Sequence, residues 1–165
     1  MAAGATYDAI KTYTFASNGT SFSWTDIPST YTDLVIIAYT KNNTNNNYEA
    51  YITYNGDSSA NYSQGFTLNY NGSLQAGQNI NINQIRPIKT GSTYWSSAQV
   101  NIMDYSATNK YKTSIGRSGD GGFASMLING LWRSTSAINR IDITIESGAQ
   151  FVAGTKFDLY GIASA

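Results

Sequence analysis

The side chains of this sequence that could do chemistry are its carboxylates, because the chain has ten Asp and Glu residues but no Cys and no His. A glycosidase needs two carboxylates about 5–10 Å apart across a cleft. Asp142 and Glu146 lie on the polar side of an alternating segment, and Asp104 directly follows another such segment. We interpret the first two as surface residues and the third as a turn cap. Mechanisms that need His or Cys are excluded, so we expect no enzymatic activity and no catalytic residue.

A glycine-rich segment, Ser118–Gly122, holds a single acidic residue, Asp120. A Ca²⁺ site needs six to eight oxygen ligands, usually from several acidic residues. No Lys-Ser or Lys-Thr pair follows the glycines, as a phosphate-binding loop requires. We therefore predict a tight turn here, and we expect the chain to use no metal and no cofactor.

Aromatic residues make up 13% of the chain, and they include Trp24, Trp95 and Trp132. Exposed aromatics can stack on sugars, but Tyr and Trp are also favoured in strands and at protein interfaces. Tyr94 and Trp95 follow a turn-like segment, residues 90–93, so we expect them at the end of a loop. We take Tyr7, Tyr94 and Trp95 as candidate interface residues. Trp95 also fits a role as a cap at one end of the core.

The charge of the chain restricts its partners. Ten Lys and Arg residues balance ten Asp and Glu residues, and charged residues make up only 12% of the sequence. A nucleic-acid-binding protein needs a basic stripe that displaces counterions. No apolar run reaches 18 residues, and the start of the chain, Met1–Tyr7, has no basic or apolar leader pattern. We expect no nucleic-acid partner, no membrane span and no signal peptide.

Alternation of apolar and polar residues with a period of two dominates the sequence and predicts strands. Asn-Gly and Gly-rich turn signals separate the segments. We expect about ten or eleven antiparallel strands, little helix and an all-β sandwich that resembles a jelly roll. The predicted strands are residues 34–39, 48–54, 66–70, 80–85 (ending near Pro87), 98–102, 111–115, 123–132, 141–145 and 157–160.

Three finer expectations concern the order of these elements. Leu34–Tyr39 is continuously apolar, which is typical of a central strand that is buried on both faces. Residues 34–40 and 48–54 are expected to pair as a hairpin across the polar loop 41–47. Residues 1–6 are small and lack a pattern, so we predict an N-terminal arm that orders only against a partner, followed by one domain over residues 7–165.

Several blocks of the sequence, taken together, carry a resemblance to a known group of proteins. They are residues 5–10, Phe22–Trp24, Ile27–Leu34, Tyr54–Asp57 with Asn61–Ser63, 104–110, 131–138 and Phe151–Ile162. Their order resembles a group of small virion structural proteins of tailed bacteriophages, including cyanophages. The blocks span nearly the whole chain, and IP-x-TYTDL with F-x-x-G-[ST]-x-F-x-LYGI is the more specific pair. From the residues alone, Pro28, Gly154 and Gly161 are turn and close-approach positions, so these blocks carry architecture.

The resemblance implies a jelly-roll-like sandwich and a structural place in the phage particle. We expect a capsid decoration or cement protein that binds the major capsid protein or other virion proteins, after assembly in the host cytoplasm. Symmetric self-association, as a trimer, is the expected form. A tail-fibre or receptor-binding module that recognises host-surface glycan is the first alternative. A glycan depolymerase is the second, and it would need two carboxylates near Trp or Tyr in a groove.

Overall fold

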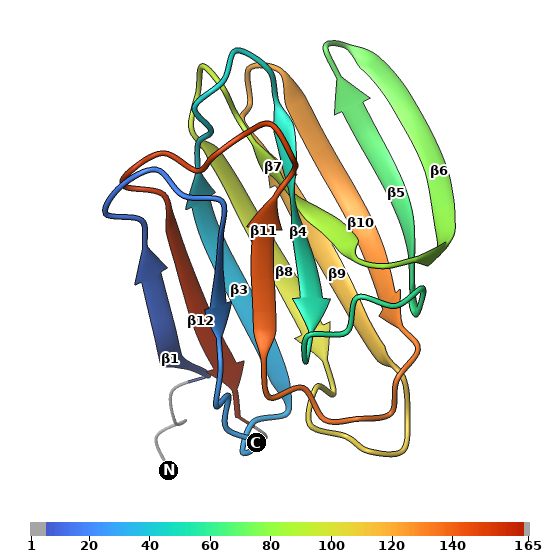
Figure 1. Cartoon of the computed structure of the whole chain (residues 1–165). Helices are drawn as coiled ribbons and strands as arrows, with labels where there is room; N and C mark the ends of the chain where they lie inside the picture. The colour runs from blue at the N-terminus through green and yellow to red at the C-terminus, as the bar shows by residue number, and fades with distance from the viewer. Residues whose placement is uncertain (1–5, 164–165) are drawn as a thin grey trace.

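The computed structural model describes residues 6–163, which fold into twelve strands arranged in two antiparallel sheets (Figure 1). The large sheet contains, in spatial order, β1 (Tyr7–Thr14), β12 (Lys156–Ile162), β3 (Asp33–Thr40), β8 (Ser96–Met103), β9 (Lys112–Gly119), β10 (Ala124–Trp132), β5 (Tyr62–Tyr70) and β6 (Ser73–Ile82). The small sheet contains β2 (Ser21–Trp24), β11 (Ile141–Ile145), β4 (Tyr48–Tyr54) and β7 (Ile85–Thr90). The predicted all-β sandwich is confirmed, with twelve strands rather than ten or eleven.

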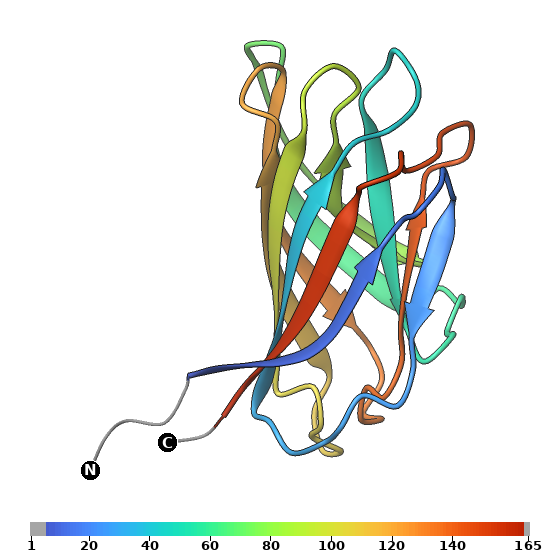
Figure 2. The same ribbon diagram turned by 90° about the vertical axis from the view of Figure 1, so that its left-hand side faces the viewer.

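The two sheets stack face to face, with the small sheet covering one side of the large one (Figure 2). The main core lies between them and includes Leu34, Ile36, Ile52, Ile143 and Phe157, each fully buried. Trp24 and Trp132 belong to this core, at 4% and 3% exposure. Alternation places these side chains on the inner faces, as expected for packed sheets.

The edge strand β7 packs unusually close to the large sheet because glycines face it there. A Cβ on Gly116 would lie 3.0 Å from the Pro87 Cβ and 2.8 Å from an Ile128 methyl carbon. A Cβ on Gly130 would lie 3.0 Å from the Ile85 Cδ1. The inner residues of β9 that face β7, Ser114, Gly116 and Ser118, are therefore small, while Ile115 and Arg117 lie on the outside.

The turn and close-approach positions that the sequence indicates are confirmed. Asn55 and Gly56 both have positive φ, at 54° and 69°, and the Asp57 N–H closes the turn on the Tyr54 carbonyl at 2.9 Å. Gly154, with φ of 87°, bends the chain before β12. Gly161 lies under the Tyr31 ring, where a Cβ would be only 2.3 Å from the nearest ring carbon.

The predicted hairpin between residues 34–40 and 48–54 is wrong. β3 pairs with β12 and β8 in the large sheet, whereas β4 pairs with β11 and β7 in the small one. The loop between them is a crossover that Asn42 holds in place. Its Nδ2 donates to the carbonyls of Thr90 at 2.9 Å and Asn46 at 3.0 Å.

Residues 80–85 were expected to form one strand, but they belong to two. Ile80 and Ile82 end β6, and Ile85 begins β7 in the other sheet. Pro87 does not end a strand. It lies inside β7, where the register shifts opposite Ala50 and Ile52, and an edge position tolerates its missing N–H.

Burial on both faces of β3 is confirmed only for its first half. Leu34, Val35 and Ile36 are fully buried, but Ile37 and Tyr39 are 39% and 51% exposed, because the outer face there is uncovered. Of the predicted arm, residues 1–5 lie outside the described part of the chain.

Candidate functional site

Five strands of the large sheet, β8, β9, β10, β5 and β6, present a nearly uncharged outer surface on the side away from the small sheet, whereas β12 carries the Lys156–Asp158 ion pair there. Register and alternation place twenty outward side chains on β8, β9, β10, β5 and β6, and we call this set the low-charge face. Its members are Ser97, Gln99, Asn101, Met103, Thr113, Ile115, Arg117, Gly119, Ser125, Leu127, Asn129, Leu131, Ser63, Gly65, Thr67, Asn69, Leu74, Ala76, Gln78 and Ile80. Arg117 is the one charged residue in the set.

Large aliphatic side chains stand exposed on the low-charge face. Leu74 is 75% exposed, Ile80 65%, Leu127 59% and Ile115 54%. Most outer-face aliphatics of a single sheet would be replaced by polar residues if water were their permanent neighbour. Exposed aliphatic residues that gather on one face are typical of an interaction surface.

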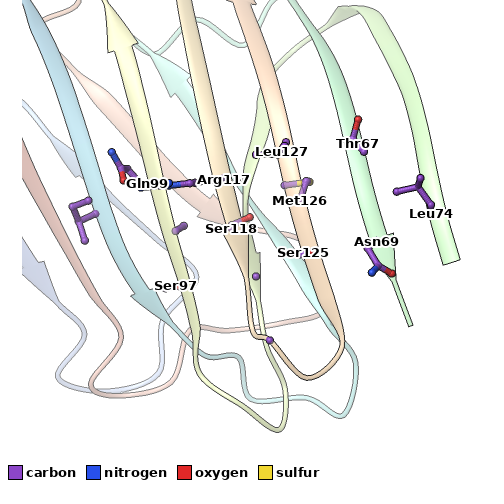
Figure 3. Close-up of a pocket in the computed structure, with 14 residues that line it drawn as sticks. Thr67, Asn69, Leu74, Ser97, Gln99, Arg117, Ser118, Ser125, Met126 and Leu127 are labelled. Carbon is purple, nitrogen blue, oxygen red and sulfur yellow. Dashed lines mark hydrogen bonds between the residues drawn. The ribbon is translucent and has the colours of Figure 1, made fainter. Parts of the chain in front are cut away.

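Two shallow grooves run across this face. The first, of about 690 Å³, is lined by residues that include Thr67, Leu74, Gln99, Arg117 and Leu127, and Ile37 of β3 adjoins it (Figure 3). The second, of about 480 Å³, lies beside Ile80, Ile115 and Leu131. Aliphatic, hydroxyl and amide groups therefore alternate along both grooves, a composition that suits a protein or neutral-ligand contact.

The single cation of the face is held within the sheet. Arg117 Nη2 donates to Gln99 Oε1 at 2.7 Å (Figure 3). Gln99 Nε2 in turn donates to Asn101 Oδ1 at 3.0 Å. This row of polar groups crosses two strands and fixes three side chains. It offers hydrogen-bonding groups with little conformational freedom left to lose on binding.

The outer face of the small sheet has the opposite character. Glu49 accepts a hydrogen bond from Lys89 Nζ at 2.6 Å and lies 3.8 Å from Arg86, whose guanidinium stacks over the Tyr51 ring at 4.9 Å. Partial burial, together with the carboxylates of Glu146 and Glu49, raises the pKa of Tyr51 to about 12 against the opposing charge of Arg86. These ion pairs lie on the face away from the grooves, whereas the Lys156–Asp158 pair lies on β12 of the large sheet, outside the low-charge face.

The acidic residues singled out in the sequence have structural partners. Asp142 pairs with Arg140 at 2.7 Å and also accepts from Ser23, on the outer face of the small sheet. Asp104 turns the chain with φ of 49° and binds Lys110 at 3.0 Å. Glu49 and Glu146 both lie near Tyr51, yet neither lines the two grooves.

The Ser118–Gly122 segment forms the predicted tight turn. Asp120 Oδ1 accepts hydrogen bonds from the backbone N–H groups of Gly122, Phe123 and Ala124, at 3.1, 2.7 and 3.1 Å. Its carboxylate is thus used by the turn itself. Within residues 6–163 no three acidic side chains gather where they could hold a metal ion.

The three candidate interface residues do not form one site. Trp95 stacks on Tyr39, with ring centroids 4.6 Å apart and planes 6° apart, at the C-terminal end of β3. Trp95 lies outside the main core, so it does not cap it. Tyr94 is 58% exposed and rests against Gly122, beside a hollow of about 190 Å³.

Tyr7 lies at the other end of the large sheet. It pairs with Ile162, which in turn pairs with Asp33 at the start of β3. Asp33 and Tyr39 are six positions apart on β3, a distance of about 20 Å. Tyr7 packs edge-on against Tyr160 and stays 51% exposed.

The aliphatic residues of the low-charge face were missed because the usual sequence signal is inverted there. In β9 the outward residues include Ile115, while the inward ones after Lys112 are Ser114, Gly116 and Ser118. In a strand with one buried face, the apolar residues are expected to point inward. The small residues of β9 were the available clue, because small inward residues indicate a closely packed neighbour.

Comparison with protein-family models and with curated proteins finds no match for this chain. The resemblance to phage virion proteins therefore stays a prediction. Among residues 6–163, no helix has the length and apolar character needed to cross a membrane.

Proposed function

We propose that this chain is a non-enzymatic structural protein of a tailed-phage particle, which decorates or cements the capsid through the low-charge face. The observation that carries the proposal is the contrast between the two outer faces. The low-charge face exposes Leu74, Ile80, Leu127 and Ile115 with a single cation, while ion pairs lie on the outer face of the small sheet and on β12, outside the low-charge face. A face that exposes aliphatic residues and little charge suits lasting contact with a shell protein.

The strand connectivity supports describing the sandwich as a jelly roll. If the hairpins β5–β6 and β9–β10 are set aside, eight strands remain, and they pair in nested order: β1 with β12, β2 with β11, β3 with β8, and β4 with β7. Successive members of this set alternate between the sheets, except that β4 and β7, which flank the β5–β6 hairpin, both lie in the small sheet. Double-sheet folds of eight strands built in this way serve as viral structural domains and as lectins.

Both inserted hairpins join the same sheet and widen it from four strands to eight. Four of the five strands that carry the low-charge face, β5, β6, β9 and β10, come from these insertions. On this proposal the eight core strands supply the fold, and the insertions supply the surface that meets the particle.

The resemblance supplies the partner, namely the major capsid protein or another virion protein. Tyr94 and Trp95 remain proposed anchors at the rim, next to the end of β3. Tyr and Trp are the residue types that most often dominate the binding energy of an interface once they are buried in it.

Copy number per particle tests the location. We expect quantitative mass spectrometry of purified particles to find on the order of hundreds of copies, as for a protein spread over an icosahedral shell. A few to tens of copies would place the protein in the tail, and absence from purified particles would refute a virion role.

One observation favours a tail-fibre or receptor-binding module as the second candidate. The exposed Tyr39 ring, stacked on Trp95, pairs in register with Ser97 at the margin of the first groove. An aromatic platform beside hydroxyl and amide groups could bind a glycan. Binding of host-surface glycan by the isolated protein, lost in Trp95→Ala, would favour this candidate.

A further inference from the structure

The edge strand β6 is open along its whole length. Nine of its ten residues are exposed, and none of the ten is charged or a proline. Leu74 and Ile80, on this strand, are the two most exposed large aliphatic side chains of the described chain, residues 6–163. An edge with these properties is a template for pairing with another strand.

The other three edges carry features that block such pairing. β1 contains Asp8 and Lys11 and an irregular register between Ala9 and Lys11. β2 is only four residues long. β7 contains Pro87 and a register shift, and it is mostly buried. Each of these features protects an edge strand, so β6 stands out as the unprotected one.

The sequence of β6 is complementary to itself in one antiparallel register. With Gly77 opposite Gly77 of a second copy, Leu74 faces Ile80 twice, and Gln75 faces Asn79 twice. Apolar side chains then meet on the outer side of the sheet and amides meet on the inner side, with no charge in the contact. The Phe66 ring of β5 packs over Gly77, where an added Cβ would lie 3.0 Å from the ring, and this contact orders the midpoint of the edge.

We propose that two copies of this chain join β6 to β6, antiparallel and centred on Gly77, about a two-fold axis. A two-fold contact uses the same surface on both copies, as the self-complementary register requires. The large sheets then form one continuous sheet, and the low-charge faces lie side by side. This contact differs from the trimer expected from the sequence. It concerns the isolated protein, so it does not depend on the proposed function.

Because the chain has no Cys, paired substitutions give a clean test of the register. In the variant Gln75→Cys with Asn79→Cys, each new thiol faces one on the other copy at the spacing of paired strands, about 4.5–5.5 Å between Cα atoms. Within one chain the two positions are about 13 Å apart, too far for a disulfide. Mild oxidation should yield a covalent dimer that reductant reverses.

Each single variant, Gln75→Cys or Asn79→Cys, is the matched control. Its thiols would be about 13 Å apart across the axis, so it should stay monomeric on a non-reducing gel. A double variant that cross-links no more than the single ones would overturn the proposal.

Sedimentation of the wild-type chain gives an independent measurement. At micromolar concentration we expect twice the chain mass of 17.9 kDa, and at least about tenfold weaker association in Leu74→Lys, which places a charge against Ile80 of the second copy. Ala9→Lys, on the β1 edge, should leave the dimer intact. A monomer, a species of three chains, or dissociation by Ala9→Lys alone would overturn the proposal. None of these results bears on attachment to a particle.

Discussion

At the scale of single residues, Asp57 ties three parts of the chain together. Its Oδ2 accepts hydrogen bonds from Trp132 Nε1 at 2.7 Å and Asn61 Nδ2 at 3.0 Å, and its Oδ1 accepts from the Ser59 N–H at 2.9 Å. The turn after β4 is thereby fixed to the start of β5 and the end of β10. Partial burial would raise the pKa of Asp57, but these donors outweigh it and hold the pKa at about 2, below the ordinary 3.8.

The lowered pKa predicts a specific loss of stability in acid. Between pH 3.8 and about 2 the folded carboxylate stays ionised while the unfolded one takes up a proton. The unfolded state therefore binds more protons, and the free energy of unfolding falls as the pH falls through this window. Urea unfolding of the wild-type chain and of Asp57→Asn should show a smaller fall in the variant. Equal falls in both would contradict this role.

At the scale of elements, the close packing of β7 on the large sheet depends on glycine. Gly116→Ala places a methyl group against Pro87 and Ile128, so β7 must shift. We expect a loss of about 1–3 kcal/mol in the free energy of unfolding, as for other overpacked sites.

Gly65→Ala is the matched control on the neighbouring hairpin. A Cβ there meets nothing closer than 3.9 Å, so this variant should keep or slightly raise the stability. Chemical denaturation measures both. A Gly116→Ala variant as stable as Gly65→Ala would show that β7 is not held at this distance.

The strands themselves could be predicted from the sequence, but their pairing could not. Alternation in β8, β11 and β12 located these strands because each has one buried face. Both sheets of a sandwich produce the same alternation, so the pattern does not say to which sheet a strand belongs. A hairpin between β3 and β4 was predicted because the two strands are neighbours in the sequence. The loop that Asn42 holds in place instead carries the chain from one sheet to the other.

The low-charge face was beyond prediction for a related reason. At Gly116 and Gly130 the inner side of the sheet is small because β7 packs there, and that contact joins segments distant in the sequence. The open edge of β6 was missed likewise. Ser73–Ile82 was not recognised as one strand, because Gly77 and Gln78 interrupt the alternation of its apolar residues.

At the scale of the whole molecule, stability should not depend on a metal ion. The chain lacks His and Cys, and residues 6–163 hold no cluster of acidic ligands. Melting with and without EDTA should give the same midpoint. A drop of several degrees on chelation would reveal a metal site and contradict this expectation.

The charge distribution predicts how the molecule attaches to a particle. Few charges are available on the low-charge face for salt to screen, so attachment should come from shape and apolar contact. Leu127→Asp, at an exposed site in the first groove, should weaken attachment without unfolding the chain. Ser21 is exposed on the outer face of the small sheet, so Ser21→Asp should leave attachment unchanged.

Rebinding to stripped phage particles tests the proposed function most directly. The protein is removed, then added back at low and at high salt, and its occupancy and the melting of the particles are measured. We predict that occupancy changes little with salt, that Leu127→Asp lowers it while Ser21→Asp does not, and that bound protein makes the particles more heat-stable. Occupancy that collapses as salt rises, or particles equally heat-stable without the protein, would contradict a cementing role.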